Sequence, residues 1–593
     1  MRTKLTAAAA LLTAALLSLP STPAQGAATA TVTVDFTTPV TQLDANDYGL
    51  DITGYGNQRY ITNDTTHREN LRRQGFGILR MELTYDANGQ LVCGGSYCDT
   101  AITGDAWVTA IRELGAEPML ILPADGRRTA AEDLADAKSI YNHFKATGTP
   151  VRKFIYGNEH DNNDNPKKMT ADEYSARYNQ VHDALHELDP SVEVGGPALA
   201  SYEPQNGTPY MDTFLAVSGS RVDFIDYHDY GAGYTRYTPE QLLTTAIDSY
   251  SSAIADLKAR IARLVPGRQI PIQIGEWNMD YSDPEGTLML SHLATVWGSA
   301  ALGTMLESGV STLLYGDKNG NFAKNTGLGI TSTEGEGGIP VSAPTPIYHG
   351  LGMFTGEGLF RRFGGTVVST TSSSNLLRAF ASTGGKNIVL VNADTAATTT
   401  SLNLTGYTSG SAQVWQSTND NWTPHQTGTL SISNGTANLT LPARSVTTLV
   451  LADQGLKGEY YGSRDLTGPV ALTRVDSTVN FDWGMGTPSA AVPVDNFSVR
   501  WTGQVDVPAA ATYSFITTTD DGVRLWVDGQ LLIDAWTDHS KRDDVGSIAL
   551  SAGKHDIRLE YYENGYDAIA QLAWSSPNLA RQVIPAARLT PAA

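Results

Sequence analysis

Cysteine and positive charge are both scarce in this 593-residue chain. It has 2 cysteines, and 41 Lys+Arg stand against 62 Asp+Glu, which gives a formal net charge of −21. A surface this acidic repels phosphate backbones and anionic lipid, so we expect neither nucleic acid nor a membrane as partner. Only 17% of the residues are charged, while Gly and Pro number 57 and 27. That composition excludes a coiled coil or collagen and suits a loop-rich protein of about three to four domains.

Long apolar runs are also lacking, apart from one near the start. Arg2 and Lys4 precede an apolar stretch rich in Ala and Leu, residues 5–19, and small residues follow it. This pattern predicts a signal peptide over residues 1–28 and a secreted, extracellular protein. The alternative is a membrane anchor, which needs about twenty apolar residues, more than this run supplies.

The two cysteines flank a short Gly-Gly-Ser-Tyr segment. Cys93 and Cys98 are close enough in sequence for this loop to close, and export favours oxidation, so we expect a disulfide between them. A metal pair is the alternative, but a tetrahedral zinc site needs further ligands that the segment does not contain. The sequence therefore predicts a small stapled loop.

Apolar and β-branched runs alternate with amphipathic helical patterns over the first half of the chain. The strand candidates are residues 48–52, 78–83, 118–123, 154–159, 192–198, 224–230, 270–278 and 313–317. The helix candidates between and after them are residues 106–114, 131–144, 171–188, 239–264, 287–306 and 346–354. Eight such alternations predict a closed (β/α)₈ TIM barrel over residues 47–360. A doubly wound sheet is the alternative, but no Gly-rich phosphate turn follows the first strand.

The pattern changes after this region. Short strands separated by Gly, Asn and Ser turns predict a β-sandwich over residues 361–453, which the N-terminal segment 31–46 is expected to join. Residues 455–593 form a third unit, again with short strands and without a helical period. The predicted architecture is therefore a TIM barrel, a β-sandwich and a C-terminal all-β sandwich.

Two glutamates stand where a barrel places its chemistry, at the carboxyl ends of strands. Glu159 ends the fourth predicted strand and Glu276 lies near the end of the seventh. Because these strands lie across the barrel mouth, the two carboxylates can face each other over a bound sugar. Glycosidic cleavage needs one carboxyl group to protonate the leaving oxygen and another to attack or to activate water. Their separation, which decides between retention and inversion, does not follow from the sequence.

The motifs around these glutamates resemble those of clan A glycoside hydrolases. Asn158-Glu159 closes strand four, residues 275–278 read Gly-Glu-Trp-Asn, and a sandwich follows the barrel. The combination is similar to the α-L-iduronidase/β-xylosidase and heparanase/β-glucuronidase families. The resemblance implies that Glu159 is the acid/base, that Glu276 is the nucleophile and that configuration is retained. It also implies that Asn158 binds the sugar 2-hydroxyl and that catalysis needs no cofactor.

Further substrate-site candidates lie at other strand ends. The resemblance assigns Arg80 to the clan's arginine near the nucleophile, and His228 with Tyr230 to its His-x-Tyr motif, although a lone histidine is more often structural. Many clan members end strand eight with a Trp that this chain lacks; Tyr315 is the expected substitute and Asp317 an expected substrate contact. Trp277 is a further substrate-binding candidate. For Asp51 and Glu82 the sequence leaves two roles open: each can bind substrate, or each can belong to a network of buried charges.

The C-terminal unit resembles the protective-antigen-like (PA-14) domain. The residues that carry the resemblance are 458–461 (Gly-Glu-Tyr-Tyr), 499–503 (Val-Arg-Trp-Thr-Gly), 519–529 and 559–563 (Leu-Glu-Tyr-Tyr-Glu). It implies that Asp520 and Asp521 bind calcium, with Asn564 and Asp567 as candidate further ligands, since calcium prefers oxygen. The alternative is an acid pair that only caps a turn.

Together these features predict a secreted retaining glycoside hydrolase that is tethered to a polysaccharide or glycoconjugate by a glycan-binding module. The alternative is a glycan-binding or adhesion protein with an inactive barrel. Loops define the sugar subsites of a barrel, so the sugar itself stays open.

Overall fold

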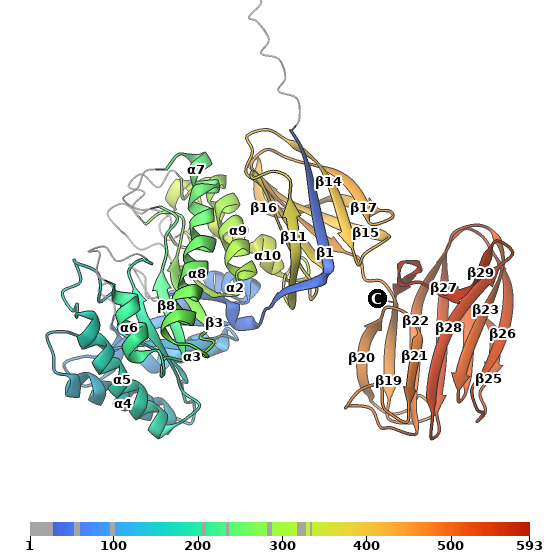
Figure 1. Ribbon diagram of the computed structural model, residues 1–593, viewed down its shortest axis with the longest axis horizontal. Helices are drawn as coiled ribbons and strands as arrows, with labels where there is room; N and C mark the ends of the chain where they lie inside the picture. Colours follow the sequence, from blue (N-terminus) through green and yellow to red (C-terminus); the bar gives the residue numbers. More distant parts are fainter. Residues whose placement is uncertain are drawn as a thin grey trace, which may run out of the picture.

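The computed structural model describes residues 28–52, 60–94, 101–202, 209–232, 237–281, 288–316, 328–332 and 335–592. Three units follow one another along the chain, a barrel in blue and green, a β-domain in yellow and an orange-to-red β-domain (Figure 1). Among the described helices, none combines the length and apolarity that crossing a bilayer requires.

The first unit is a closed barrel of eight parallel strands, which confirms the predicted TIM barrel. The strands are β2 (Tyr48–Asp51), β3 (Ile78–Tyr85), β5 (Glu117–Leu122), β6 (Lys153–Tyr156), β7 (Glu193–Leu199), β8 (Phe224–His228), β9 (Ile272–Trp277) and β10 (Ser311–Tyr315). The first strand, β2, pairs with both β3 and β10, which closes the cylinder. A short strand that the sequence pattern did not predict, β4 (Leu91–Cys93), pairs antiparallel with β3.

Helices surround this barrel. They are α1 (Tyr60–Asn63), α2 (Thr65–Gln74), α3 (Gly104–Glu113), α4 (Ala130–Ala146), α5 (Ala171–Leu188), α6 (Tyr210–Ser218), α7 (Pro239–Leu243), α8 (Thr245–Leu264), α9 (His292–Glu307) and α10 (Pro346–Thr355). The single helix predicted over residues 239–264 divides at Thr244, whose φ and ψ of −122° and −79° are not helical. Helix α9 is buried along nearly its whole length because strands of the second unit cover the side that the barrel leaves exposed.

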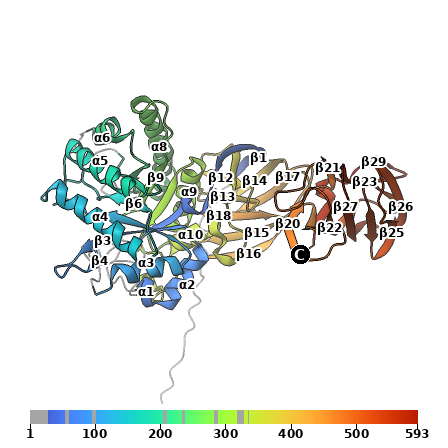
Figure 2. The same ribbon diagram turned by 90° about the horizontal axis from the view of Figure 1, so that it is seen from below.

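The second unit is a nearly closed sheet of nine strands around its own core. Its strands, in spatial order, are β16 (Asn421–Ile432), β15 (Gly410–Thr418), β18 (Ser445–Leu451), β13 (Asn387–Asn392), β12 (Leu377–Ser382), β11 (Thr366–Ser372), β1 (Ala28–Gln42), β14 (Thr398–Thr405) and β17 (Thr436–Leu441). The N-terminal strand β1 pairs antiparallel with β11 and parallel with β14. The unit packs on α9 and α10 of the barrel, an arrangement that is also visible from below (Figure 2).

The C-terminal unit consists of two antiparallel sheets over a core that includes Trp501 and Tyr561. One sheet holds β20 (Val470–Asp476), β19 (Leu456–Tyr461), β22 (Phe497–Val507), β27 (Gly553–Glu563), β24 (Val523–Val527), β25 (Gln530–Ala535) and β30 (Leu589–Pro591). The other holds β21 (Asn480–Gly484), β28 (Ala568–Ser576), β23 (Ala511–Asp520), β26 (Arg542–Leu550) and β29 (Leu579–Val583). This arrangement confirms the predicted all-β fold.

Candidate active site

Glu159 lies in a tight turn that follows β6. The backbone is left-handed at Gly157, with φ 72°, and at Glu159, with φ 51°. A side chain at position 157 would come within 2.3 Å of the His160 imidazole, so glycine is required there. Asn165 donates hydrogen bonds of 3.0 Å to the carbonyl oxygens of both Asn158 and Glu159. These bonds hold a non-glycine residue in a sparsely populated conformation, as is common at functional sites.

Glu276 projects from β9, where the strand departs from regular pairing with β8. The preceding Gly275 has no space for a side chain, because a Cβ would lie 2.2 Å from a carboxylate oxygen of Asp226. Glu276 is only 7% exposed. Its position therefore depends on close packing between β8 and β9.

A fully buried guanidinium, that of Arg80 on β3, organises the cluster. Its Nη1 contacts the Asp51 carboxylate and donates to Glu276 Oε1 at 2.8 Å. Its Nη2 donates to Asn158 Oδ1 at 2.5 Å and lies 3.3 Å from His228 Nε2. Burial alone would lower the pKa of Arg80, but the charges of Asp51 and Glu276 outweigh it and raise the pKa. The cation thus stays charged and fixes one oxygen of Glu276.

His228, on β8, lies between the two glutamates. Its Nδ1 is 2.9 Å from Glu159 Oε1, and its Nε2 is 3.6 Å from Glu276 Oε1. One ligand atom of each of these three residues lies within 4.8 Å of the others. Burial would lower the pKa of the imidazole, but the Glu276 charge and the bond to Glu159 raise it to about 9. The structure thus brings both predicted glutamates together across one imidazolium.

The environment of Glu159 differs from the expectation for an acid catalyst, which would have a raised pKa. Burial raises the pKa of this carboxyl group, but the hydrogen bond and charge of His228 and the bond from Asn162 Nδ2, at 3.0 Å, outweigh it. The net effect is a lowered pKa. Glu159 and His228 therefore form an ion pair here, and the proton resides on the imidazole.

Aromatic side chains line the other side of Glu276. The Tyr230 hydroxyl donates to Glu276 Oε2 at 2.9 Å, so both oxygens of that carboxylate are engaged. Tyr315, near the end of β10, packs edge-on against Tyr230 with ring centroids 6.1 Å apart. Asn278 donates from its amide to the Tyr315 carbonyl at 2.9 Å and holds the ends of β9 and β10 together. Tyr315 therefore lies next to the cluster, and its contact with the sugar stays a prediction.

Trp277 lies elsewhere, contrary to its predicted substrate contact. Side chains alternate across a strand, so the indole points away from the face that carries Glu276. It is 1% exposed and packs against Trp297 of α9 with ring centroids 5.9 Å apart. Its position is in the layer between barrel and helices. Two other predicted residues, Asp317 and Cys98, lie outside the described residues, so the substrate contact and the disulfide stay predictions.

The two strand-end acids that the sequence left open have different surroundings. Asp51 is a buried partner of Arg80, which makes it a network acid. Glu82 is paired with Lys167 at 3.3 Å, near the surface. Asn162 and Asp226 also belong to the site, although no sequence motif singles them out. Neither ends a strand motif, so only their packing against Glu159 and Gly275 identifies them.

A second carboxylate cluster lies in the C-terminal unit. Oxygens of Asp520, Asp521 and Glu563 lie within 4.8 Å of one another. Asp521 accepts hydrogen bonds from the backbone nitrogens of His539 and Asn564 at 2.8 and 2.9 Å. The sequence predicts Asn564 and Asp567 as further ligands, and it does not predict Glu563 as one.

The buried Glu563 suits a cation site. Its side chain is fully buried, and Oε1 has no hydrogen-bond partner among the described residues. Burial and the neighbouring Asp521 and Asp520 charges raise its pKa to about 7. Oxygen donors that repel one another in this way match the preference of Ca²⁺. The Asn564 side-chain oxygen is less suitable, because it already accepts from Arg464 at 2.5 Å.

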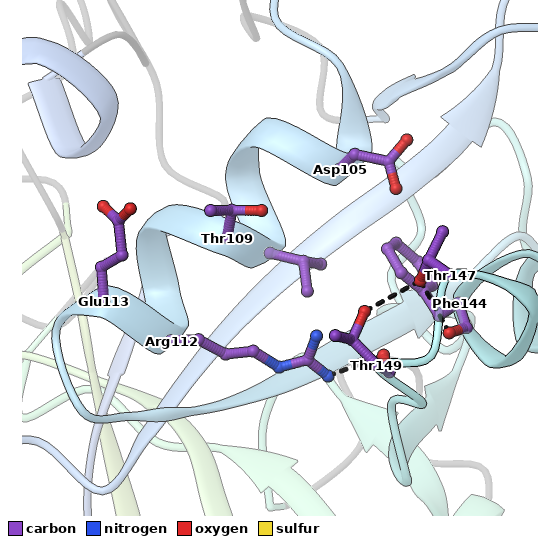
Figure 3. A pocket seen from close by; sticks show the side chains of 8 residues that line it. Asp105, Thr109, Arg112, Glu113, Phe144, Thr147 and Thr149 are labelled. Carbon is purple, nitrogen blue, oxygen red and sulfur yellow. Dashed lines mark hydrogen bonds between the residues drawn. The ribbon is translucent and has the colours of Figure 1, made fainter.

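A separate depression of about 570 Å³ lies on the outside of the barrel, between α3 and the turn after α4 (Figure 3). Arg112 of α3 donates to the Thr149 carbonyl at 2.9 Å across it. None of the predicted site residues lines this depression. The cluster of Glu159, His228 and Glu276 is therefore separate from this depression.

Family comparisons agree with both resemblances. Residues 149–296 match the family model described as glycosyl hydrolases family 39, and residues 452–587 match that of the PA14 domain. The first match spans Glu159, His228 and Glu276. The predicted combination of a clan A glycoside hydrolase domain with a C-terminal PA-14 domain is thereby confirmed.

Individual relatives cover only parts of the chain. Anti-sigma-I factor RsgI3 of Acetivibrio thermocellus is 47% identical over 138 residues, 23% of this chain and 21% of that protein. The chain spans about a fifth of the length of the curated relatives it matches.

Solved structures extend the comparison to the barrel and the second unit. An α-L-arabinofuranosidase from Thermotoga maritima, in complex with arabinose, has a TM-score of 0.56 and 18% identity, over 71% of this chain and 99% of that one. A family 44 xyloglucanase from Paenibacillus polymyxa has a TM-score of 0.52 and 15% identity, over 72% and 100% of the two chains. At these identities the likeness shows the fold.

Proposed function

We propose that this protein is a secreted, retaining glycoside hydrolase that cleaves O-glycosidic bonds of a polysaccharide or glycoconjugate by double displacement. The observation that carries the proposal is the pairing of Glu159 with Glu276, whose facing oxygens lie within 4.8 Å. Retaining enzymes hold their carboxyl groups about 5–5.5 Å apart, whereas inverting enzymes leave about 6.5–9.5 Å for a water molecule. The short separation favours a covalent intermediate.

Glu276 is the nucleophile in this proposal. Arg80 binds one of its oxygens and Tyr230 the other, so the carboxylate is ionised and oriented before the sugar arrives. Its attack forms a bond to the anomeric carbon while the bond to the leaving oxygen breaks. The Arg80 charge stabilises the carboxylate before this step and after its release.

Glu159 supplies the proton to the leaving oxygen, and His228 stores it beforehand. The Nδ1 proton of the imidazolium lies on a 2.9 Å bond to Glu159, so its transfer yields a neutral acid and a neutral imidazole. A bound sugar would exclude water from the Glu159 side chain, which is 24% exposed, and such desolvation raises the pKa of a carboxyl group. Once Glu276 is esterified, Glu159 accepts a proton from the incoming water.

Asn158 is suited to bind the sugar 2-hydroxyl. Arg80 occupies its side-chain oxygen at 2.5 Å, which fixes the amide so that nitrogen is the group left to donate. Among the described residues, that nitrogen has no hydrogen-bond acceptor in the structure. A donor fixed in this way favours a hydroxyl whose bond strengthens in the oxocarbenium-like transition state.

The C-terminal unit would bind glycan and keep the barrel close to its polymer. Asp520, Asp521 and Glu563 would hold a calcium ion. When bound, this ion would coordinate hydroxyl groups of the sugar. Tethering raises the effective concentration of the substrate without new contacts at the catalytic site.

The test is azide rescue of Glu276→Ala and Glu159→Ala on a panel of aryl glycosides. General acid/base residues contribute about 10²–10⁴-fold to the rate of a reaction. We therefore expect the turnover rate of Glu159→Ala to fall by that factor and the turnover rate of Glu276→Ala to fall further. Azide should restore turnover of substrates with activated leaving groups. The glycosyl azide formed by Glu276→Ala should have inverted anomeric configuration, and the one formed by Glu159→Ala should have retained configuration. Glu82→Ala is the matched control, because this strand-end acid pairs with Lys167 outside the cluster.

The glycan-binding alternative makes a different prediction. A non-catalytic barrel would release no sugar from any substrate in the panel and would still be retained on polymer in a calcium-dependent way. Activity that survives unchanged in Glu276→Ala would contradict the assignment of the nucleophile.

A further inference from the structure

Two histidines and an aspartate meet at the end of the barrel opposite Glu276. His182 and His186 lie one turn apart near the C-terminus of α5, and their rings stack with centroids 4.1 Å apart. Asp223 directly precedes β8 and therefore lies at the amino end of that strand. One ligand atom of each of these three residues lies within 4.8 Å of the others.

The distances within this cluster match those between ligands of one metal ion. His186 Nε2 lies 3.0 Å and His182 Nε2 3.7 Å from the same oxygen, Asp223 Oδ2. Two ligands at zinc bond lengths of about 2.0–2.2 Å in a tetrahedral site are separated by roughly 3.3–3.5 Å. The two histidine–aspartate separations lie on either side of that value, and the ligand atoms of the two histidines lie within 4.8 Å of each other. Because the two rings stack at an interplanar angle of 22°, one of them must turn for both lone pairs to point at a shared ion.

His182 already has the hydrogen bonding of a metal ligand. Its Nδ1 lies 3.1 Å from Asp183 Oδ1, and Asp183 is held in turn by Arg221 at 2.9 and 3.1 Å. A proton on Nδ1 leaves the lone pair on Nε2, and ligating histidines typically donate their other nitrogen to a carboxylate in this way. The side chain is 9% exposed, and Nε2 has no hydrogen-bond partner among the described residues. It faces Asp223.

An ordinary histidine–aspartate pair in the same barrel gives a contrast. His143 on α4 bonds Asp105 at 2.8 Å, with side chains that are 36% and 50% exposed. No second imidazole joins that pair among the described residues. Water can satisfy its remaining nitrogen, whereas the His182 nitrogen is removed from water.

We propose that His182, His186 and Asp223 bind a divalent transition-metal ion of the zinc class. Two imidazoles and one carboxylate favour zinc, copper or nickel over calcium or magnesium, which prefer an all-oxygen set. The fourth position is left for water, since His186 is 28% exposed. Asp223 also accepts a 2.7 Å bond from the Val194 backbone nitrogen of β7. The metal therefore joins α5 to the amino ends of β7 and β8.

This site would stabilise the barrel and take no part in sugar cleavage. The strand β8 that begins after Asp223 ends at His228, five residues later. A metal that fixes its beginning restricts movement of the whole strand. We expect a higher melting temperature with zinc and an unchanged pH profile of activity.

The test is zinc binding to the chelator-treated full chain, with bound zinc per chain and affinity measured by competition with a chromophoric chelator. Variants His186→Gln and Asp223→Asn remove one ligand each, and Asp183→Ala removes the outer hydrogen bond to His182 together with the Arg221 contact. His143→Gln is the matched control. Far-ultraviolet circular dichroism checks that each variant is folded.

We expect the wild-type chain and His143→Gln to bind one more zinc ion than His186→Gln or Asp223→Asn. Asp183→Ala should retain the ion with about 10–100-fold weaker affinity, the usual cost of losing an outer-shell partner. The proposal is overturned if the wild-type chain binds no zinc at micromolar concentrations. It is equally overturned if His186→Gln binds as much zinc, as tightly, because the ion then resides at another carboxylate cluster.

Discussion

Removal of the imidazole between the two glutamates is expected to change how stability depends on pH. His228 is fully buried, with Glu159 2.9 Å from one ring nitrogen and Glu276 3.6 Å from the other. Burial opposes its charge, but the Glu276 charge and the Glu159 hydrogen bond raise its pKa to about 9, against an ordinary 6.5. A glutamine side chain at this position cannot titrate, so in the variant His228→Gln this residue no longer makes stability depend on pH.

The sign and size of this pH dependence of stability follow from the difference in the pKa of His228 between the folded and unfolded chains. A raised folded pKa means that the folded chain binds the proton more tightly, so this stabilisation is complete below about pH 6.5. It is lost progressively as pH rises from 6.5 through about 9. Each pKa unit corresponds to about 1.4 kcal/mol, so the barrel should lose about 3 kcal/mol of unfolding free energy across this window.

The assay is urea unfolding of wild-type and His228→Gln chains from pH 6 to pH 10. We expect the wild-type advantage to shrink by about 3 kcal/mol between pH 6.5 and pH 9.5. The control His143→Gln removes an exposed histidine paired with Asp105. Its difference from wild type in unfolding free energy should vary much less with pH. A wild-type advantage that is constant across the range would refute the assignment of a protonated His228.

Three further changes test other parts of the account. Tyr230→Phe removes one hydrogen bond to the ionised Glu276, worth about 1.5–3 kcal/mol, so kcat should fall about 10- to 100-fold while the melting temperature stays within a few degrees. Gly275→Ala places a Cβ 2.2 Å from a buried oxygen of Asp226, and calorimetry should show about 1–3 kcal/mol of destabilisation. Calcium should raise the melting temperature of the C-terminal unit, and Asp521→Asn should abolish that rise; an equal rise in the variant would place calcium elsewhere.

Strand alternation was sufficient to predict the barrel and the positions of its main site residues. Each predicted strand overlaps an observed one, because the apolar runs of buried parallel strands are short and distinct from helical patterns. Glu159 and Glu276 follow from their places at strand ends. His228, the last residue of β8, bonds Glu159, and Tyr230, two residues further on, bonds Glu276.

Features that depend on packing were beyond reach of the sequence. Trp277 was expected beside the sugar, but the register of β9 points it toward α9. An acid catalyst calls for a raised pKa, but the lowering effect of His228 on the pKa of Glu159 depends on a 2.9 Å contact between residues 69 positions apart. Glu563 could not be chosen among 62 acidic residues, since only the fold brings it to Asp520 and Asp521.

Trapping of a covalent intermediate tests the two-carboxylate mechanism most directly. The full chain would be incubated with a panel of 2-deoxy-2-fluoro glycosides that carry activated leaving groups, then digested and analysed by mass spectrometry. We expect one glycosyl group per chain, on the peptide that contains Glu276, and none in Glu276→Ala. A label on another residue, or turnover of the parent glycosides with inverted configuration and no label, would contradict double displacement through Glu276.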